Sequence, residues 1–354
     1  MGAERIRQLA MDCGFELAGI AQALPPADFA RYRAWIEAGF AGEMRYLTDH
    51  RAALRTDPRN LLPGARSVVC VGKCYNRPEP YSTGCRDPGR GWISRYAWGR
   101  DYHAVMRAGL KRLAARLREE AGGEFRYRIA VDTAPLLERS FARLAGLGWI
   151  GKNSCLIHER SGSWYFLGEL LTTLELSPDV PPPDRCGTCT RCIEACPTAA
   201  IVPADSAAEG PAYTIDARLC IAYLTIERRG PFSAGEDGLL GRHVFGCDIC
   251  QDVCPWNRRA PAATDPAFAA RHYAPPLEEL AALSWQEFDE LFRGSPVRRV
   301  RYTGFLRNVA AAMGNAGLEK FRAPLERLAA SPTAEVAQAA RRALERLDRQ
   351  ARST

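Results

Sequence analysis

Two cysteine-rich stretches decide the fold of the second half of the chain, CGTCTRCIEACP at 186–197 and CDICQDVCP at 247–255. The first reads C-x₂-C-x₂-C-x₃-C-P, and the second reads C-x₂-C-x₃-C-P. Closely spaced thiolates on one tight turn, followed by a Cys-Pro pair, are typical of the ligands of a [4Fe-4S] cluster. The sequence therefore predicts two such clusters, which would carry electrons.

A separate cysteine supplies the ligand that the second stretch lacks. Cys220 lies before Cys247, and the 26 residues 221–246 separate the two. In bacterial ferredoxins the fourth cysteine of each run ligates the other cluster. Applied to this chain, that rule gives one cluster to Cys186, Cys189, Cys192 and Cys254, and the second to Cys196, Cys220, Cys247 and Cys250.

A structural zinc site and a disulfide framework are the alternatives for these cysteines. Zinc sites pair two CxxC knuckles a dozen or more residues apart, which does not match three cysteines on one turn. A disulfide scaffold is not expected in a long chain without a secretory signal. The other five cysteines show no ligand spacing, and most are expected to be small buried hydrophobic residues: Cys13, Cys70, Cys74, Cys85 and Cys155.

Length and composition indicate an ordinary globular protein. The 354 residues suffice for two or three domains, and 47% are hydrophobic and 25% charged. No run of eighteen apolar residues occurs, so no membrane span is expected. We expect a cytoplasmic protein, because thiolates stay available for iron in that compartment.

The net charge of +7 is unevenly distributed. The stretch RGSPVRRVRYTGFLR at 293–307 holds five arginines and no acidic residue. Arginine forks bind phosphates and aromatic rings stack on bases, so the stretch suits a nucleic-acid backbone. The alternative is a solvated helix face, or ion pairs with the acidic residues Glu287, Asp289 and Glu290.

Periodicity predicts an α/β region, a linker and a helical tail. Helices are expected at 3–13, 28–40, 101–120 and 135–145, and strands at 67–71 and 125–131. Residues 155–176 resemble a hairpin that turns at 161–162, and the proline-rich residues 177–185 resemble a stiff linker. A helix is expected at 216–227. Two similar helical pieces near 305–315 and 336–345 suggest a short HEAT-like repeat.

Three further motifs leave alternatives open. GLGWIGKNS at 146–154 is a glycine-rich loop whose Lys152 either meets a phosphate-like or amide-rich ligand or belongs to a packing loop. Asp132 follows a predicted strand, so it is either a desolvated general acid or, as spacing alone favours, a helix N-cap. DYHAVM at 101–106 begins like a cobalamin-ligating loop, but Met106 replaces the required glycine, and His103 is not assigned to cobalt.

Motifs from about residue 55 to about 317 resemble, in order, those of the epoxyqueuosine reductase family. They read RYAWGRDYH, DTAPLLERSFARLAGLGWIGKNS, FLGELL, CIAYLTIE, GCDICQDVCPWN and SPVRRV. That resemblance implies a cobalamin-binding domain related to that of reductive dehalogenases, two [4Fe-4S] clusters, and reduction of an epoxide on the wobble base of tRNA. It also implies an external low-potential electron donor. No membrane is expected as a partner, and the protein is expected to be a monomer.

The resemblance also assigns an architecture. It implies an α+β protein with an N-terminal α/β cobalamin-binding catalytic domain at 1–176 and a ferredoxin-like double-cluster domain at 177–260. A HEAT-like, tRNA-binding helical domain follows at 261–354.

The resemblance assigns residues as well. Asp132 matches the proton donor, which reverses the preference for a cap. The residues matched to the surroundings of cobalamin are Arg55, Arg95, Tyr96, Asp132, Asn153, Ser154, Leu167, Gly168 and Asp248. Those expected to meet tRNA are Arg228, Arg298, Arg299 and Arg301. Two other functions remain open, a cobalamin-dependent reductase of a small molecule and a non-enzymatic electron-transfer adaptor.

Overall fold

A four-stranded antiparallel sheet forms the centre of the N-terminal half. The structure, a computed structural model, describes residues 2–204 and 210–352. The strand order is β1-β2-β7-β4, and every neighbouring pair is antiparallel. The strands are β1 (Leu17–Gln22), β2 (Ser67–Cys74), β7 (Tyr165–Thr172) and β4 (Tyr127–Ala130). Because both neighbours of β7 run antiparallel to it, this region is α+β and not a parallel α/β sheet.

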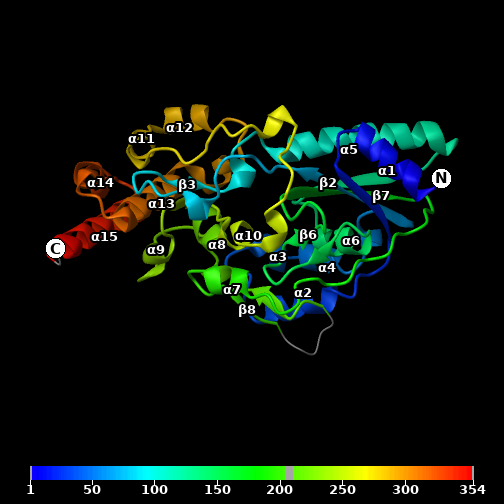
Figure 1. Ribbon diagram of the computed structural model, residues 1–354, viewed down its shortest axis with the longest axis horizontal. Coiled ribbons are helices and arrows are strands. Elements are labelled where there is room, and N and C mark those ends of the chain that lie inside the picture. The colour runs from blue at the N-terminus through cyan, green and yellow to red at the C-terminus, as the bar shows by residue number, and fades with distance from the viewer. Residues whose placement is uncertain (1, 205–209, 353–354) are drawn as a thin grey trace.

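Helices cover both faces of this sheet (Figure 1). On one face lie α1 (Ala3–Asp12) and the long α5 (Tyr102–Ala121), which share a core with Phe166 and Leu170 of β7. On the other face lies α6 (Glu138–Leu144), packed with Leu167 and Leu171. Side chains alternate along a strand, so consecutive residues of β7 serve opposite cores. Three short helices follow β1, namely α2 (Phe29–Glu37), α3 (Arg45–Thr48) and α4 (Arg51–Leu54).

The predicted hairpin at 155–176 is wrong in its pairing. β6 (Leu156–Ile157) pairs with β5 (Trp149–Ile150), and only an isolated bridge joins His158 to Gly162. β7 pairs instead with β2 and β4, which occupy both of its edges along the buried centre of the sheet. The expected helices at 3–13, 28–40, 101–120 and 135–145 are present, although α6 begins three residues after Pro135. The strand β1 had not been predicted.

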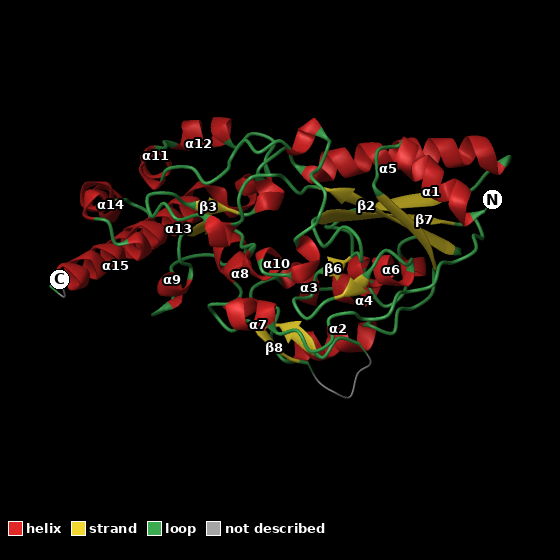
Figure 2. Cartoon of the chain, viewed as in Figure 1, coloured by secondary structure: helices red, strands yellow, loops and turns green. Residues whose placement is uncertain are grey.

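The cysteine-rich region is built from short elements (Figure 2). They are α7 (Arg191–Ala195), β8 (Ile201–Pro203), β9 (Tyr213–Ile215), α8 (Ile221–Ile226), α9 (Glu236–Leu239), β10 (His243–Phe245) and α10 (Ile249–Asp252). β8 and β9 form a two-stranded antiparallel sheet. The helix expected at 216–227 is shorter than predicted, because a 3₁₀ turn at Ala217–Leu219 precedes α8.

Helices make up the C-terminal part, as predicted. They are α11 (Leu277–Ala282), α12 (Trp285–Leu291), α13 (Arg301–Ala316), α14 (Arg322–Ala329) and α15 (Ala334–Ala351). The ends of the described chain lie at opposite ends of the molecule (Figure 1). Among the described residues, none of the helices combines the length and the apolar character needed to cross a bilayer.

One N-terminal segment belongs to the C-terminal core. β3 (Trp92–Ile93) pairs in parallel with β10, and Trp92 and Trp98 are buried in the same core as Phe305 and Val309 of α13. The helical tail is therefore tied to the first third of the chain as well as to the cluster region.

Two buried polar residues fix α13 to α8. The guanidinium of Arg307, which is fully buried, donates to the carbonyl oxygens of Leu224 at 3.1 Å and Gly230 at 2.7 Å. Asn308 donates to the carbonyl oxygens of Thr225 at 2.8 Å and Val244 at 2.9 Å. These bonds hold the arginine-rich stretch against the cluster region, because each satisfies a buried group that would otherwise be unpaired.

Candidate functional site

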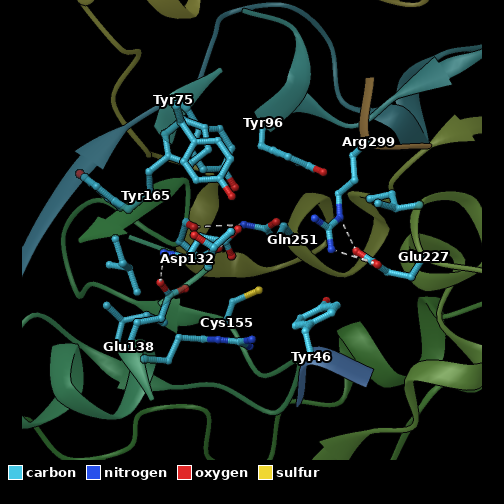
Figure 3. A pocket seen from close by; sticks show the side chains of 18 of the residues that line it. Tyr46, Tyr75, Tyr96, Asp132, Glu138, Cys155, Tyr165, Glu227, Gln251 and Arg299 are labelled. Carbon is cyan, nitrogen blue, oxygen red and sulfur yellow. Dashed lines mark hydrogen bonds and ion pairs between the residues drawn. The ribbon is translucent and has the colours of Figure 1, made fainter. Parts of the chain in front are cut away.

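A cavity of about 560 Å³ lies where the end of the central sheet, the cluster region and the arginine-rich stretch meet (Figure 3). Five tyrosines line it: Tyr46, Tyr75, Tyr96, Tyr102 and Tyr165. Burial raises the pKa of Tyr46 and of Tyr165 to about 12, so both remain neutral phenols. The other lining residues include Phe166, Leu167 and Gln251.

A second cavity of about 450 Å³ adjoins the first. The two share Tyr46, Asp132, Glu138 and Arg139. The second cavity reaches back to α2, where the guanidinium of Arg55 lies 5.7 Å from the ring centre of Tyr32. Together the cavities form a large space with Asp132 at the junction, which suits a bulky ligand.

Asp132 sits on the loop between β4 and α6 with a positive φ of 48°. It does not cap α6, because that helix begins at Glu138 and its N-cap residue, Leu137, makes no side-chain capping bond. The N-cap alternative is therefore wrong. Instead, the Asp132 carboxylate faces the cavity and accepts a hydrogen bond from Nε2 of His103 at 3.1 Å.

His103 lies at the start of α5 between two carboxylates. Its Nδ1 donates to Asp101 Oδ1 at 2.7 Å, and its ring stacks on Tyr102 at a centroid distance of 4.3 Å. The hydrogen bonds with Asp101 and then Asp132 raise the pKa of His103 to about 9. His103 is therefore an imidazolium at neutral pH.

The neighbours of Asp132 also set its charge. Burial raises the pKa of Asp132, but the hydrogen bonds from His103 and Tyr102 outweigh burial and leave the pKa below its ordinary value. At neutral pH the His103–Asp132 pair thus holds one shared proton. Sequence reasoning missed this role, because it tested DYH only as a cobalt ligand. The sequence feature that indicates this role is a histidine two residues after Asp101, which caps α5.

Four of the predicted cluster ligands surround one small cavity of about 70 Å³: Cys186, Cys189, Cys192 and Cys254. Burial raises the pKa of Cys192 and of Cys254 to about 11. Burial likewise raises the pKa of Cys186, while the indole N–H of Trp149 acts in the opposite direction by favouring the thiolate. The structure brings Cys254 to the cysteines of the first run, as crossed ligation requires.

The other four predicted ligands also come together. Burial raises the pKa of Cys247, and the nearby thiols of Cys220 and Cys196 raise it further. A hydrogen bond with Cys155, and then burial, raise the pKa of Cys250, and the charges of Cys247 and Cys220 raise it further. The Cys196 sulfur accepts a hydrogen bond from the Ala200 N–H at 3.3 Å. Nowhere in residues 2–204 and 210–352 do three such ligands converge on one point as a single ion demands. Cluster ligands surround a cube and need not converge.

The glycine-rich loop serves the cluster region. Lys152 Nζ donates to the carbonyl oxygens of Gly187 at 2.8 Å and Cys189 at 2.9 Å, so it clamps the cysteine loop. The side chain of Asn153 donates to the carbonyl oxygen of Cys250 at 3.3 Å. The packing interpretation of this loop therefore replaces the phosphate-binding one.

The residues matched to cobalamin divide into two groups. Five of them line the joined cavities: Arg55, Tyr96, Asp132, Ser154 and Leu167. Four do not: Arg95, Asn153, Gly168 and Asp248.

Like Asn153, Asp248 and Arg95 have partners within the protein. Asp248 is 1% exposed and accepts bonds from the Trp92 indole at 3.0 Å and the Arg95 N–H at 2.7 Å. The Arg95 guanidinium donates to backbone oxygens and lies 4.5 Å from the Trp98 ring centre. Both residues therefore have partners within the protein, and their expected role at the cofactor stays a prediction.

The arginines expected to meet tRNA are mostly paired. Arg298 pairs with Asp289, as the ion-pair alternative predicted, and Arg228 pairs with Glu43. Arg299 pairs with Glu227 at 2.6 Å, and both line the cavity that holds Asp132. The arginine-rich stretch is therefore not remote from the catalytic region. Arg301 is exposed and makes no ion pair within the part of the chain that the structure describes.

Comparison with known proteins agrees with this geometry. Residues 55–133 match the family described as epoxyqueuosine reductase QueG, DUF1730, and residues 185–257 match the 4Fe-4S double cluster binding domain. An epoxyqueuosine reductase of Xanthomonas campestris is 44% identical over 330 residues, which cover 92% of this chain and 90% of that protein. The chain belongs to the epoxyqueuosine reductase family.

Other epoxyqueuosine reductases show the same relationship. That of Escherichia coli is 39% identical over 89% of this chain and 81% of its own length. A solved epoxyqueuosine reductase with a tRNA-Tyr epoxyqueuosine-modified stem loop superposes with a TM-score of 0.83 at 28% identity, covering 97% of this chain and 89% of that one. The enzyme from Streptococcus thermophilus gives 0.82 at 29% identity, covering 97% and 90%.

Proposed function

We propose that this chain reduces epoxyqueuosine to queuosine at the wobble position of tRNA, the last step of queuosine synthesis. The observation that carries the proposal is the tyrosine-lined cavity in which the His103–Asp132 pair faces both the cluster region and Arg299. Such a cavity admits an extruded nucleotide, places a proton beside it and brings electron carriers close.

The residues present fit the two kinds of cofactor. Each set of four cysteines supplies the donors of one [4Fe-4S] cluster, and the Ala200 N–H donates to the sulfur of Cys196. The joined cavities offer apolar walls at Phe166 and Leu167 and polar groups at Arg55 and Ser154, which suits cobalamin with its amide-bearing rim. Cobalamin, when bound there, supplies a strongly reducing cobalt centre.

The side chains of the protein itself supply and transfer the proton. His103 stores a proton that Asp132 passes to the oxygen leaving the epoxide, and Asp101 keeps the imidazole in the orientation needed for this transfer. Tyr46, Tyr96 and Tyr102 surround the reacting group as neutral phenols that accept and donate hydrogen bonds without changing charge.

The partners and architecture follow from the same proposal. The anticodon stem-loop would approach from the side of Arg299 and Arg301, as a tRNA stem-loop is the ligand named for a solved relative. The tail at 261–354 would act as a HEAT-like tRNA-binding domain beside the catalytic domain at 1–176 and the cluster domain at 177–260. We further propose a cytoplasmic monomer that draws on an external low-potential electron donor.

The test is conversion of tRNA by the purified protein carrying both clusters and cobalamin. Nucleoside mass spectrometry of epoxyqueuosine-containing tRNA should show loss of one oxygen in the wild type. Asp132→Asn should retain both cofactors and lose most turnover, by a factor on the order of 10² to 10⁴. Unchanged tRNA together with reduction of small epoxides would instead favour a small-molecule reductase. Failure to retain cobalamin would favour an electron-transfer adaptor.

A further inference from the structure

The proposed reaction needs more protons than one His–Asp pair holds. Opening the first C–O bond of the epoxide leaves an alkoxide, which takes one proton. Breaking the second C–O bond forms the C=C bond and expels the hydroxyl group, which takes a second proton and leaves as water. The two electrons come from the reduced cofactor. The His103–Asp132 pair shares a single transferable proton, so a second donor is required.

Glu138 is placed to be that donor. It is the first residue of α6, and it lines both cavities at their junction. Its Oε2 accepts the backbone N–H of Asp132 at 3.3 Å, so the two carboxyl groups are held close together at the cavity wall (Figure 3). Glu138 is partly buried and lines both cavities.

The surroundings of Glu138 favour its neutral form. The titratable and charged groups that face it from the packed elements are Asp132 after β4, Tyr102 and His103 on α5, Arg139 on α6, Glu169 on β7 and Cys70 on β2. Burial, and then the Asp132 charge, raise the pKa of Glu138 to about 7, while Arg139, the backbone N–H of Asp132 and His103 oppose the shift. Glu138 therefore carries a proton at and below neutral pH.

A second buried carboxyl provides a comparison. Glu169 lies in the middle of β7, is 1% exposed, and neither of its carboxyl oxygens has a hydrogen-bond partner among the described residues. Burial raises its pKa well above the ordinary value, and Glu138 and Asp132 add to the shift. Glu169 is thus neutral as well, but it lines neither cavity.

We propose that Glu138 supplies the second proton of the epoxide reduction, passing it into the cavity beside Asp132. The inference rests on the proposed function and deepens it, because it assigns the two protons of the reaction to two separate groups. Glu138 takes a new proton from water between turnovers, through the second cavity.

The experiment compares Glu138→Gln and Glu169→Gln in protein that carries both clusters and cobalamin. Glu138→Gln should lower kcat for tRNA reduction by a factor on the order of 10², leave KM for tRNA unchanged and abolish the fall of kcat as pH rises through about 7. Glu169→Gln should keep both the wild-type kcat and that pH limb. Wild-type kcat with an intact limb in Glu138→Gln, or loss of the limb only in Glu169→Gln, overturns the proposal.

Two further measurements keep the test decisive if Glu138→Gln folds poorly. Glu138→Asp retains a titrating carboxyl and should show a displaced pH limb, so a profile without any limb in Glu138→Asp contradicts the proposal. The infrared difference spectrum between the wild-type holoprotein and Glu138→Asp cancels the bands of other buried carboxyls such as Glu169 and Asp252. It should contain a wild-type protonated carboxyl band that disappears as pH rises through about 7, and its absence contradicts the proposal. Failure of the wild type to reduce tRNA would refute the proposed function, whereas the infrared difference band reports on Glu138 alone.

Discussion

At the scale of single residues, the protonation state of the site is set by the hydrogen bonds between Asp132 and its neighbours rather than by one acid alone. Desolvation at the cavity wall alone would raise the pKa of Asp132, yet the hydrogen bonds from His103 and Tyr102 reverse that shift. The proton needed for chemistry therefore resides on the imidazole, and Asp132 is the group that passes it on. Enzymes commonly separate a proton store from the group that meets the substrate.

The first prediction concerns His103. His103→Gln can form similar hydrogen bonds but has no proton to give, so kcat should fall by a factor on the order of 10² near pH 8. The wild-type pKa of about 9 means that the imidazolium is lost, and activity declines further, as pH rises through 9. In His103→Gln this limb should be absent, and activity should return only at acidic pH, where Asp132 itself binds a proton.

The measurement is a pH profile of kcat for the wild type, His103→Gln and His158→Gln. His158 is a suitable control, because its ring hydrogen-bonds Ser161 and lines neither cavity. A retained limb near pH 9 in His103→Gln would show that another group stores the proton.

Part of this site could be predicted from the sequence. Asp132 and the cysteines were found because their neighbours in sequence form recognisable motifs. Tyr46, Glu227 and Arg299 were not found as cavity residues, because they come from three distant segments that meet only in the folded chain. Sequence spacing carries no information on such contacts.

At the scale of elements, α10 and the residues on either side of it carry ligands of both predicted clusters. Cys247 and Cys250 belong with Cys220 and Cys196, whereas Cys254 reaches the cavity of the first run. One short helix thus joins the two predicted clusters.

Cys254→Ser should therefore remove mainly the cluster held by Cys186, Cys189 and Cys192. The iron content should fall from about eight atoms per chain toward about four, because each cluster holds four irons. Iron analysis with EPR of the reduced protein checks this result, and Cys13→Ser, in the core shared by α1 and α5, should keep all the iron. Loss of the signal from the Cys247 and Cys250 cluster alone would contradict the crossed arrangement.

Element prediction succeeded where local pattern decides the outcome. The spacing of Leu110, Leu113 and Leu117 identified α5, because the apolar face of an amphipathic helix can be recognised from residues within a few turns of one another. The pairing of β7 could not be predicted, because two strands far away in sequence compete with the local hairpin. β1 was missed because LAGIAQ is rich in small residues, and Gly19 is required where the backbone of Ala145 lies close.

At the scale of the whole molecule, the arginine-rich stretch lies on the approach to the cavity. Arg299 is part of the cavity wall, and Arg301, which is exposed and has no ion pair with any described residue, lies two residues further along the chain. Arg298 is occupied by Asp289. The three arginines are therefore expected to differ in their contribution to tRNA binding.

Arg301→Ala should weaken tRNA binding and reduce the slope of log K against log salt by about 0.7 to 0.9, since one phosphate contact is lost. Arg298→Ala should change that slope less and lower stability slightly, by about 0 to 1 kcal/mol, because it removes a surface ion pair. Binding titrations at several salt concentrations and melting curves check both variants. Equal slopes for Arg301→Ala and the wild type would exclude Arg301 from the tRNA surface.

The placement of Trp92 and Trp98 in the C-terminal core has a consequence for synthesis on the ribosome. The central sheet is complete once residue 172 has emerged, but the segment 92–98 cannot be buried until β10 and α13 exist. At about 5–20 residues per second, roughly 10–40 s pass before those partners are made. During that interval two large aromatic side chains stay exposed on a nascent chain, so chaperones that hold apolar segments should engage this stretch, and a stall before α13 should leave an aggregation-prone product.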